Sequence, residues 1–459
     1  MKLIAVACLV LAGSALFAMG QATSASEKDK SCGPPNYCAR TDQRIEPYPK
    51  TPPVLGPAGS IIADPSFGSR IVRITDAKSD PQGRKRSLMT PSSAEQNSWN
   101  VDSTKFYIVT AGGQYMLYRF DPSTLKVHQD QVLPVPWQGE PDFSYTRPNV
   151  IYGVRRNNPA IQEYDTSNGK AARINLASDC LKLNASDFGH SVSVSADDDR
   201  WSTMLGPAQD ENPLIYVYDR KLGCRWYNTL TGTVGGQWGP KGAVSVPDRC
   251  TLHNAKMSKS GEFIWLACGA HITRSGWLVW EVATANVLAC AARCSGHHAL
   301  GYSHVVGPSG EKHPLDLLVR NLNRLRSSTQ LVPDLQPTIS ARYWYDSHLS
   351  WNYANPQDTT PVCLSTYGGS NPNTPGAPLD TIAPWENEIL CVETDGKSSN
   401  IWRFAHTYST ANNGFWSTPR GNVSQDGRFF MFTSDWQDQL GYSSENKQYR
   451  TDVFVVELH

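Results

Sequence analysis

A recurring hairpin constrains the fold of this chain more than any other feature of its sequence. Its clearest copy is residues 415–436, FWSTPRGNVSQDGRFFMFTSDW, in which a tight Ser-Gln-Asp-Gly turn precedes an apolar, β-prone run. Residues 191–205 and 255–268 repeat the same order of polar strand, serine turn and apolar strand, and residues 97–109 do so less clearly. The chain therefore repeats one supersecondary unit.

A repeat of about 40 to 50 residues is typical of a β-propeller, in which each repeat forms one four-stranded blade. Helical arrays need a 3.6-residue apolar period, and leucine-rich solenoids need a shorter repeat dominated by leucine. The sequence has neither pattern. We predict blades at residues 97–131, 142–176, 189–230, 252–291, 296–332 and 346–406, and a last one that starts at residue 415.

The last blade offers only three strands, the final one at residues 451–458. An isolated β-run, RIVRITD at residues 70–76, is the predicted fourth strand, and its pairing would remove the exposed sheet edges of an open ring. The sequence therefore predicts an all-β, seven-bladed propeller closed by pairing an N-terminal strand with the C-terminal blade.

The N-terminus and the charge balance predict where the protein works. Residues 1–25 resemble a secretory signal, residues 26–59 form a Pro-rich tether or surface strap, and residues 60–459 form the propeller. No later stretch of about 20 apolar residues follows, so we expect a secreted or periplasmic monomer without a membrane span. Lys and Arg number 42, as do Asp and Glu, and this neutral balance argues against a nucleic-acid partner.

Ten cysteines remain once the signal segment is removed, an even number that suits an oxidising compartment. The alternative, a cysteine metal site, lacks the paired CxxC spacing. The hairpin geometry and short loop spacings favour four disulfides: Cys250–Cys268, Cys363–Cys391, Cys32–Cys38 and Cys290–Cys294.

Histidines recur at matching positions in the repeats. His190, His253 and His304 each stand five residues before a serine aligned with the hairpin turns, and His348 opens the sixth blade. Because the first strand of each blade lines the central channel, these imidazoles are predicted to converge at the funnel mouth. The links between blades add His406, and Arg342 and Arg403 are close by in sequence. Such a mixture can bind a divalent metal or an anionic sugar, or move a proton.

Structural roles are the alternative for each of these residues. A histidine at a strand start can simply bond a neighbouring blade, Arg420 can pair with an acidic neighbour, and tryptophans such as Trp344, Trp351, Trp402 and Trp416 can pack in blades instead of stacking on sugars. The sequence contains no GxSxG elbow, P-loop or HExxH motif, and we expect no organic cofactor.

The turn segments SQDGRFFMFTSD, SKSGEFIWLAC and SADDDRWSTML resemble the TolB-type propeller repeat, with Gln, Lys or Ala where Pro is usual. Through His348, the RFAHTYST stretch and the final GRFFMFTSD blade, the chain also resembles secreted oligogalacturonate and ulvan lyases. This resemblance implies a polysaccharide lyase that cleaves uronate-containing oligosaccharides by β-elimination. It also implies a divalent metal (manganese, zinc or calcium) and an acidic oligo- or polysaccharide as partner.

The resemblance also implies roles for individual residues. His190 or His253 would serve as the base, His348, His406 and His304 would hold the metal, and the substrate would contact Arg420, Arg342, Arg403, Tyr353 and Asn254. Two other functions stay open. One is a non-catalytic carbohydrate- or protein-binding propeller, and the other is a glycoside hydrolase that would need two carboxylates among Glu95, Asp187 and Asp346.

Overall fold

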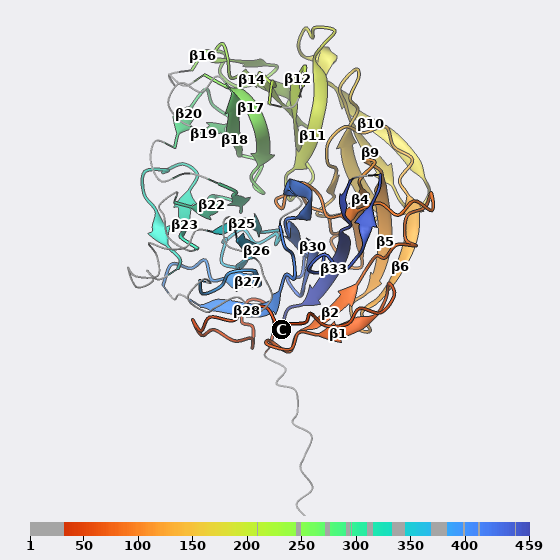
Figure 1. Cartoon of the computed structure of the whole chain (residues 1–459). Coiled ribbons are helices and arrows are strands. Elements are labelled where there is room, and N and C mark those ends of the chain that lie inside the picture. Colours follow the sequence, from red (N-terminus) through yellow and green to blue (C-terminus); the bar gives the residue numbers. More distant parts are fainter. Residues whose placement is uncertain are drawn as a thin grey trace, which may run out of the picture.

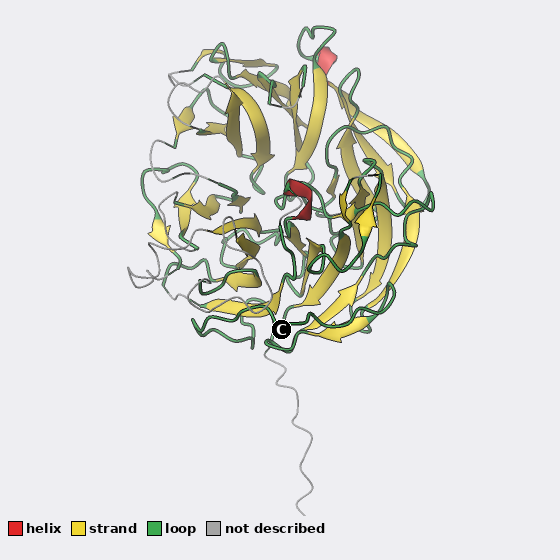
Figure 2. Ribbon diagram, in the orientation of Figure 1, coloured by secondary structure: helices red, strands yellow, loops and turns green. Residues whose placement is uncertain are grey.

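The strands of the described residues form seven blade sheets arranged in a ring and one additional two-stranded hairpin, as the computed structural model in Figure 1 shows. The structure describes residues 32–208, 210–244, 249–270, 276–290, 294, 296–309, 315–332, 345–368, 383–397, 400–411, 414–445 and 447–459. The predicted secretory signal and Arg342 lie outside these residues. Strands dominate the described chain (Figure 2), and no helix within it could cross a lipid bilayer. The predicted seven-bladed propeller is confirmed.

The first three blades follow the predicted order. Blade 1 contains β3 (Leu88–Met89), β4 (Lys105–Thr110), β5 (Tyr115–Asp121) and β6 (Lys126–Val132). Blade 2 contains β7 (Asp142–Phe143), β8 (Val150–Val154), β9 (Ala160–Asp165) and β10 (Lys170–Leu176), followed by the 3-10 turn η1 (Ala177–Asp179). Blade 3 has six strands, β11 (Phe188–Val194), β12 (Arg200–Gly206), β13 (Leu214–Asp219), β14 (Gly223–Asn228), β15 (Thr233–Gly236) and β16 (Gly242–Ala243).

Three further blades have four strands each. Blade 4 contains β17 (Thr251–Met257), β18 (Phe263–Ala270), β19 (Trp277–Glu281) and β20 (Val287–Ala289). Blade 5 contains β21 (Ala299–Leu300), β22 (His304–Pro308), β23 (Leu317–Asn321) and β24 (Thr329–Gln330). Blade 6 contains β25 (Tyr345–Ser350), β26 (Val362–Gly368), β27 (Glu388–Val392) and β28 (Ile401–His406).

Blade 7 joins the two ends of the chain. After the 3-10 turn η3 (Phe415–Ser417), it contains β29 (Gly421–Val423), β30 (Phe429–Ser434) and β33 (Asp452–Glu457), with the hairpin β31 (Tyr442–Ser443) and β32 (Gln448–Tyr449) between the last two. The strand β2 (Arg70–Arg73) pairs with β33, so the predicted ring closure is confirmed. A fifth strand, β1 (Ile61–Ala63), which the sequence did not predict, covers the outer edge of β2.

The recurring hairpin is one turn geometry used several times. The backbone N–H of Gly427 donates to the carbonyl of Ser424 over 3.0 Å, and Gly261 donates to Ser258 over 2.8 Å. Both glycines have φ of +72°, a region that side chains disfavour, which explains the glycine at this position. The serine turn therefore ends the first strand of a blade and starts the second.

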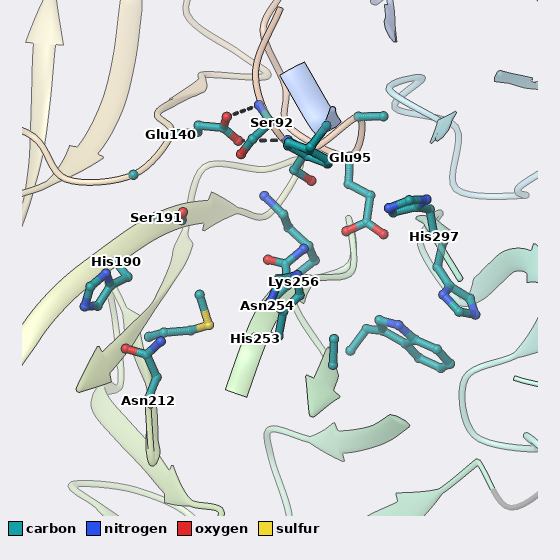
Figure 3. Close-up of a pocket in the computed structure, with 18 of the residues that line it drawn as sticks. Ser92, Glu95, Glu140, His190, Ser191, Asn212, His253, Asn254, Lys256 and His297 are labelled. Atoms are coloured by element: carbon teal, nitrogen blue, oxygen red, sulfur yellow. Dashed lines mark hydrogen bonds between the residues drawn. The ribbon is translucent and has the colours of Figure 1, made fainter. Parts of the chain in front are cut away.

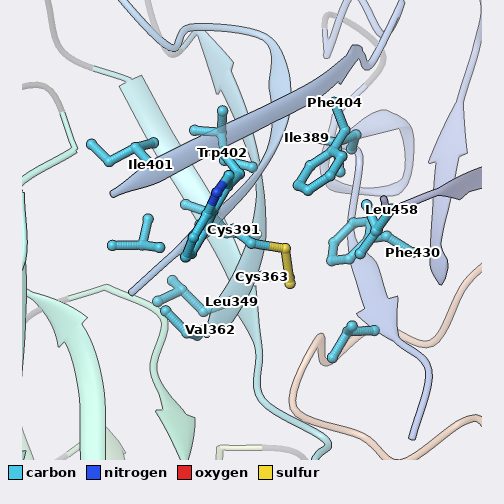
Figure 4. Close-up of a cluster of buried hydrophobic side chains, with 14 of the residues drawn as sticks. Leu349, Val362, Cys363, Ile389, Cys391, Ile401, Trp402, Phe404, Phe430 and Leu458 are labelled. Atoms are coloured by element: carbon cyan, nitrogen blue, oxygen red, sulfur yellow. A yellow bond between two sulfur atoms is a disulfide. The ribbon is translucent and has the colours of Figure 1, made fainter. Parts of the chain in front are cut away.

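Most of the core lies within and between the blades. The cluster in Figure 4 joins blades 6 and 7 through Leu349, Trp402 and Phe430, all at most 4% exposed. The disulfide between Cys363 and Cys391 runs through this cluster. All four predicted disulfides are confirmed, and a fifth joins Cys180 to Cys224. Five disulfides fit an extracellular or periplasmic protein.

Residues 32–59, called the strap below, run along the outer strand of blade 6 and then reach blade 7, where Nε1–H of Trp436 donates to the Pro53 carbonyl over 2.9 Å. Arg40 forms a backbone bridge with Arg403 of β28. Tyr37 and Tyr48 are 6% and 5% exposed and belong to the same core cluster. The strap therefore covers one end of the blade 6 sheet.

Candidate functional site

A cavity of about 520 Å³ opens at the funnel end of the innermost strands. His190 is the third residue of β11, and His253 is the third residue of β17. Both line this cavity together with Asn254 and Lys256 (Figure 3). Glu95 reaches it from the loop between β3 and β4 of blade 1, and His297 reaches it from the link before blade 5. Residues from several blades therefore meet in one polar pocket with aromatic walls.

His253 forms an oriented pair with an aspartate. Its Nδ1 bonds the carboxylate of Asp210, which lies in the loop between β12 and β13. An Nδ1–H that donates to a carboxylate leaves the lone pair on Nε2, the tautomer of a general base. The His253 side chain is 54% exposed, so solvent and a ligand can reach it.

His190 lies at another side of the same pocket. Its Nε2 lies 3.4 Å from the carbonyl oxygen of Gly206. Burial lowers the pKa of His190, so the ring is neutral near pH 7. The structure thus brings both histidines considered as bases to one cavity, together with Asn254.

A carboxyl group lies among cations deeper in the pocket. In Figure 3 the Glu95 side chain extends between Lys256 and His297. Burial raises the pKa of Glu95 to about 7, although the charges of Lys256 and His297 oppose that change. Lys256 is buried and donates from Nζ to Oε1 of Gln96, whose Nε2 in turn donates to Asp142 over 2.7 Å. The lysine charge is therefore held at a fixed position.

His297 differs from His190 in its proton affinity. Its Nδ1 lies 3.0 Å from the carbonyl oxygen of Ser347 and 3.7 Å from the carboxylate of Asp346. Burial disfavours the charged ring, but the Asp346 carboxylate outweighs it and raises the pKa of His297. The pocket thus contains one histidine shifted toward the neutral form and one shifted toward the imidazolium.

The three histidines expected to hold a metal do not converge. His348 lies behind the pocket, 1% exposed, with its ring centroid 4.1 Å from that of His297. Burial lowers the pKa of His348 well below its usual value.

His304 instead begins β22, the second strand of blade 5, and bonds Asp358 over 3.0 Å beside a separate cavity of about 440 Å³. Its expected place on the innermost strand is wrong, because that strand is β21.

His406 and Arg403 lie under the strap. Both belong to β28, the outermost strand of blade 6. His406 bonds the backbone oxygen of Glu46 over 3.0 Å. Burial disfavours its charge, but the Asp64 carboxylate at 3.5 Å raises the pKa of His406. Arg403 donates to both oxygens of Glu388 over 2.8 and 2.6 Å. These contacts hold the strap and the blade, so the expectation that both residues face the funnel is wrong.

Two further residues expected to contact a substrate also have structural surroundings. Tyr353 is 7% exposed and shares a 2.5 Å hydrogen bond with Tyr37 of the strap, away from the cavity. Arg420 is fully buried behind Phe415 and Trp416. Of the three carboxylates considered for hydrolysis, only Glu95 is among the described residues that line the pocket.

A divalent metal, which the resemblance implies, does not fit the described residues. Nowhere within the described ranges do three His, Cys, Asp or Glu side chains come together closely enough to hold a metal ion. In the pocket, the fixed positive charge belongs to Lys256 instead.

Sequence reasoning missed Lys256 and Asp210. Strict alternation along β17 would send His253 and Lys256 to opposite faces, but a β-bulge shifts the register between Leu252 and Asn254. The bulge lets both side chains reach the pocket, and no single-sequence signal marks it. The proximity of Asp210 to His253 depends on loop conformation, which the repeat pattern does not specify.

Comparison with solved structures supports the fold. An oligogalacturonate lyase in complex with manganese aligns with a TM-score of 0.52 at 12% identity, covering 89% of this chain and 98% of its own. An oligogalacturonate lyase from Vibrio parahaemolyticus aligns with a TM-score of 0.51 at 11% identity over the same shares. Neither a family model nor a curated protein sequence matches the chain. At such low identity the likeness concerns the fold.

Proposed function

We propose that this propeller binds an acidic oligosaccharide in its funnel and cleaves it beside a uronate by β-elimination. The observation that carries the proposal is one cavity that combines the His253–Asp210 pair with Lys256, Glu95 and His297. The likeness to oligogalacturonate lyase propellers agrees with this chemistry.

The proposed reaction begins with removal of a proton from the carbon next to the uronate carboxylate. Nε2 of His253 accepts this proton, because Asp210 holds the other ring nitrogen as a donor. The C5–H bond breaks, a C4–C5 double bond forms, and the C4–O bond to the leaving sugar breaks. The leaving oxygen takes a proton, which His297 supplies because the Asp346 carboxylate favours its imidazolium.

Cations stabilise the charge that develops on the uronate carboxylate. Lys256 lies in the pocket with its ammonium group held by Gln96, and Arg156 also lines the wall. A preorganised cation of this kind stabilises an enolate-like intermediate more than the ground state. Glu95, with its pKa of about 7, separates Lys256 from His297 and limits their mutual repulsion.

A binding propeller without catalysis is the second candidate. The aromatic residues Trp277, Phe415 and Trp416 line the same cavity and suit a bound sugar ring whether or not a bond is broken. In that case Lys256 and Arg156 would serve as anion-binding groups only.

A screen of uronate-containing oligosaccharides tests the proposal. Elimination creates a conjugated double bond, so the product absorbs ultraviolet light, whereas hydrolysis creates none. Binding seen by calorimetry without an absorbing product would favour the binding propeller, and the absence of both would reject the two candidates.

A further inference from the structure

Two large aromatic side chains lie exposed on the wall of the funnel cavity. The 3-10 turn η3 places Phe415 and Trp416 there, and they are 46% and 43% exposed. Their ring centroids lie 5.2 Å apart in an edge-to-face arrangement. By contrast, the tryptophans of the blade cores, such as Trp201 and Trp436, are fully buried. These two rings therefore keep nearly half of their surface exposed on the side away from their packing contacts.

A buried arginine holds both rings from behind. The guanidinium carbon of Arg420 lies 4.6 Å from the ring centroid of Phe415 and 4.8 Å from that of Trp416. Its Nη1 donates to the carbonyl of Phe415, and its Nη2 donates to that of Trp416 over 3.3 Å. The same side chain therefore fixes the backbone of the turn and supports the faces of its rings.

Among the described residues no carboxylate lies within ion-pair distance of Arg420, although the charge of Glu140 acts on it from farther away, and the side chain is fully buried. Burial lowers the pKa of Arg420 to about 10, so the guanidinium still carries its charge at neutral pH. Burying a charge without an ion-pair partner costs free energy, and the two rings and two carbonyls offset part of that cost. The arrangement places a fixed positive charge directly behind an exposed aromatic surface.

Further hydrogen bonds make the turn rigid. Thr418 donates from Oγ1 to the carbonyl of Phe415 over 2.7 Å, and Ser417 donates to the carbonyl of Gly414 over 2.9 Å. A ring that is already immobilised loses little conformational entropy when a ligand stacks on it. Exposed, preorganised aromatic rings at the edge of a polar cavity are typical of a binding site.

We propose that Phe415 and Trp416 form a stacking subsite for one sugar ring of the substrate, positioned by Arg420. This inference rests on the proposed function, because the ligand class of the subsite is that of the proposed substrate. The apolar C–H face of the sugar packs on the rings, and the positive charge behind them favours a uronate ring over a neutral hexose. The subsite would bind a sugar next to the one that reacts.

The variant Trp416→Ala tests the subsite in the full chain. Stacking of an aromatic ring contributes about 0.5 to 1.5 kcal/mol, so we expect the Kd for a uronate tetrasaccharide to rise roughly 2- to 13-fold. If the protein is a lyase, KM rises by the same factor while kcat changes little. The wild type should bind a matched neutral tetrasaccharide more weakly than the uronate tetrasaccharide. Trp416→Ala should change the Kd of the neutral sugar less than that of the uronate.

The hairpin β31–β32 provides a matched control. Tyr442 and Tyr449 form another exposed edge-to-face pair, 59% and 40% exposed, away from the cavity lining. Tyr442→Ala should leave the Kd unchanged. Arg420→Gln should weaken uronate binding. It should also increase the mobility of the Trp416 ring. Time-resolved tryptophan anisotropy would detect this motion, with the Trp416→Phe variant identifying which part of the signal belongs to Trp416.

The possible results separate the subsite from the proposed reaction. Weaker binding by Trp416→Ala with no ultraviolet product from the wild type would support the subsite and reject the lyase. A product formed with unchanged Kd and KM in Trp416→Ala would support the lyase and overturn the subsite. If the wild type binds none of the uronate oligosaccharides, the subsite is also overturned.

Discussion

His253 and His304 each bond an aspartate through Nδ1, and their surroundings give the two pairs different roles. Asp358, beside His304, also accepts the backbone N–H groups of Tyr302 and Ser303 over 2.6 and 2.8 Å, so it holds a turn of blade 5. In the other pair, His253 lines the funnel cavity with an accessible ring. Residue type and pairing are the same in both, but Asp358 is 3% exposed and bonds the backbone, whereas Asp210 is 49% exposed beside the cavity.

The first prediction compares these two pairs. His253→Gln removes the proposed base and should lower kcat/KM on a uronate oligosaccharide by roughly 100-fold or more. Asp210→Asn keeps the imidazole but loses its preferred tautomer, so its loss should be smaller. His304→Gln should leave the rate unchanged. Steady-state rates of ultraviolet product formation measure all three, and equal rates for His253→Gln and wild type would exclude His253 as the base.

The second prediction concerns His298, which packs against Trp265 and Trp277 and is 1% exposed. Burial lowers the pKa of His298 to about 3, whereas the unfolded chain has its ordinary value of 6.5. Below about pH 6.5 the unfolded state therefore binds a proton that the folded state does not, and stability falls as the pH falls.

His298→Phe removes this titration and keeps the packing against the tryptophans. Between about pH 7.5 and pH 5, the free energy of unfolding of the wild type should fall by about 2 kcal/mol more than that of the variant. Denaturant titrations at both pH values measure this difference. The carboxyls with raised pKa, such as Asp142, are present in both proteins and cancel in the comparison. Parallel pH profiles would contradict a neutral, buried His298.

At the scale of the elements, ring closure depends on β2. The Ile74 N–H donates to the Val453 carbonyl over 2.8 Å, and alternation along the antiparallel ladder directs the Val72 N–H to Val455. On the other side of β2, Arg73 donates to Ser60 over 2.9 Å, which leaves the Ile61 N–H pointing away from the sheet. Val72 therefore joins two ends of the chain, while Ile61 lies on an open edge.

The third prediction uses proline at these two positions. Val72→Pro removes a closure hydrogen bond and a buried side chain, and should cost roughly 3 kcal/mol of unfolding free energy. Ile61→Pro, at a side chain that is 45% exposed, should cost less than about 1 kcal/mol. Thermal and denaturant unfolding compare the two. Equal losses would show that the ring does not depend on the β2–β33 ladder.

The sequence predicted the blades well because the serine turn recurs with its own hydrogen bonds. It failed where the repeat is irregular. The innermost strand of blade 5 has only two residues, so counting back from Ser309 reached the second strand and selected His304. His406 and Arg403 were misplaced because nothing in the sequence shows that the strap covers β28. Contacts between distant segments require the three-dimensional fold.

At the scale of the whole molecule, the chain has no net charge, yet its funnel concentrates cations around Glu95. The ring brings links from separate blades to one end, so the site combines residues as distant in sequence as Glu95 and His297. A cavity of this kind can bind an anion without a strongly basic surface. The fixed cation of this cavity is a lysine, whereas the resemblance implied a metal held by His348, His406 and His304.

The fourth prediction concerns the use of a lysine instead of a metal in the cavity. Because the described residues form no three-ligand metal group, treatment with a chelator should leave oligosaccharide binding and product formation within about 2-fold of the untreated protein. Lys256→Ala should reduce both. Elemental analysis of the treated protein verifies that metal was removed. Loss of function on chelation, restored by manganese, would contradict the lysine-based account.

Formation of an unsaturated product tests the central claim most directly. Wild-type protein and His253→Gln are incubated with a panel of uronate-containing oligosaccharides, and ultraviolet absorbance is followed over time. The account predicts that absorbance rises with at least one substrate for the wild type and stays near background for the variant. No rise for the wild type with any substrate that it binds would contradict an eliminase and leave a binding propeller.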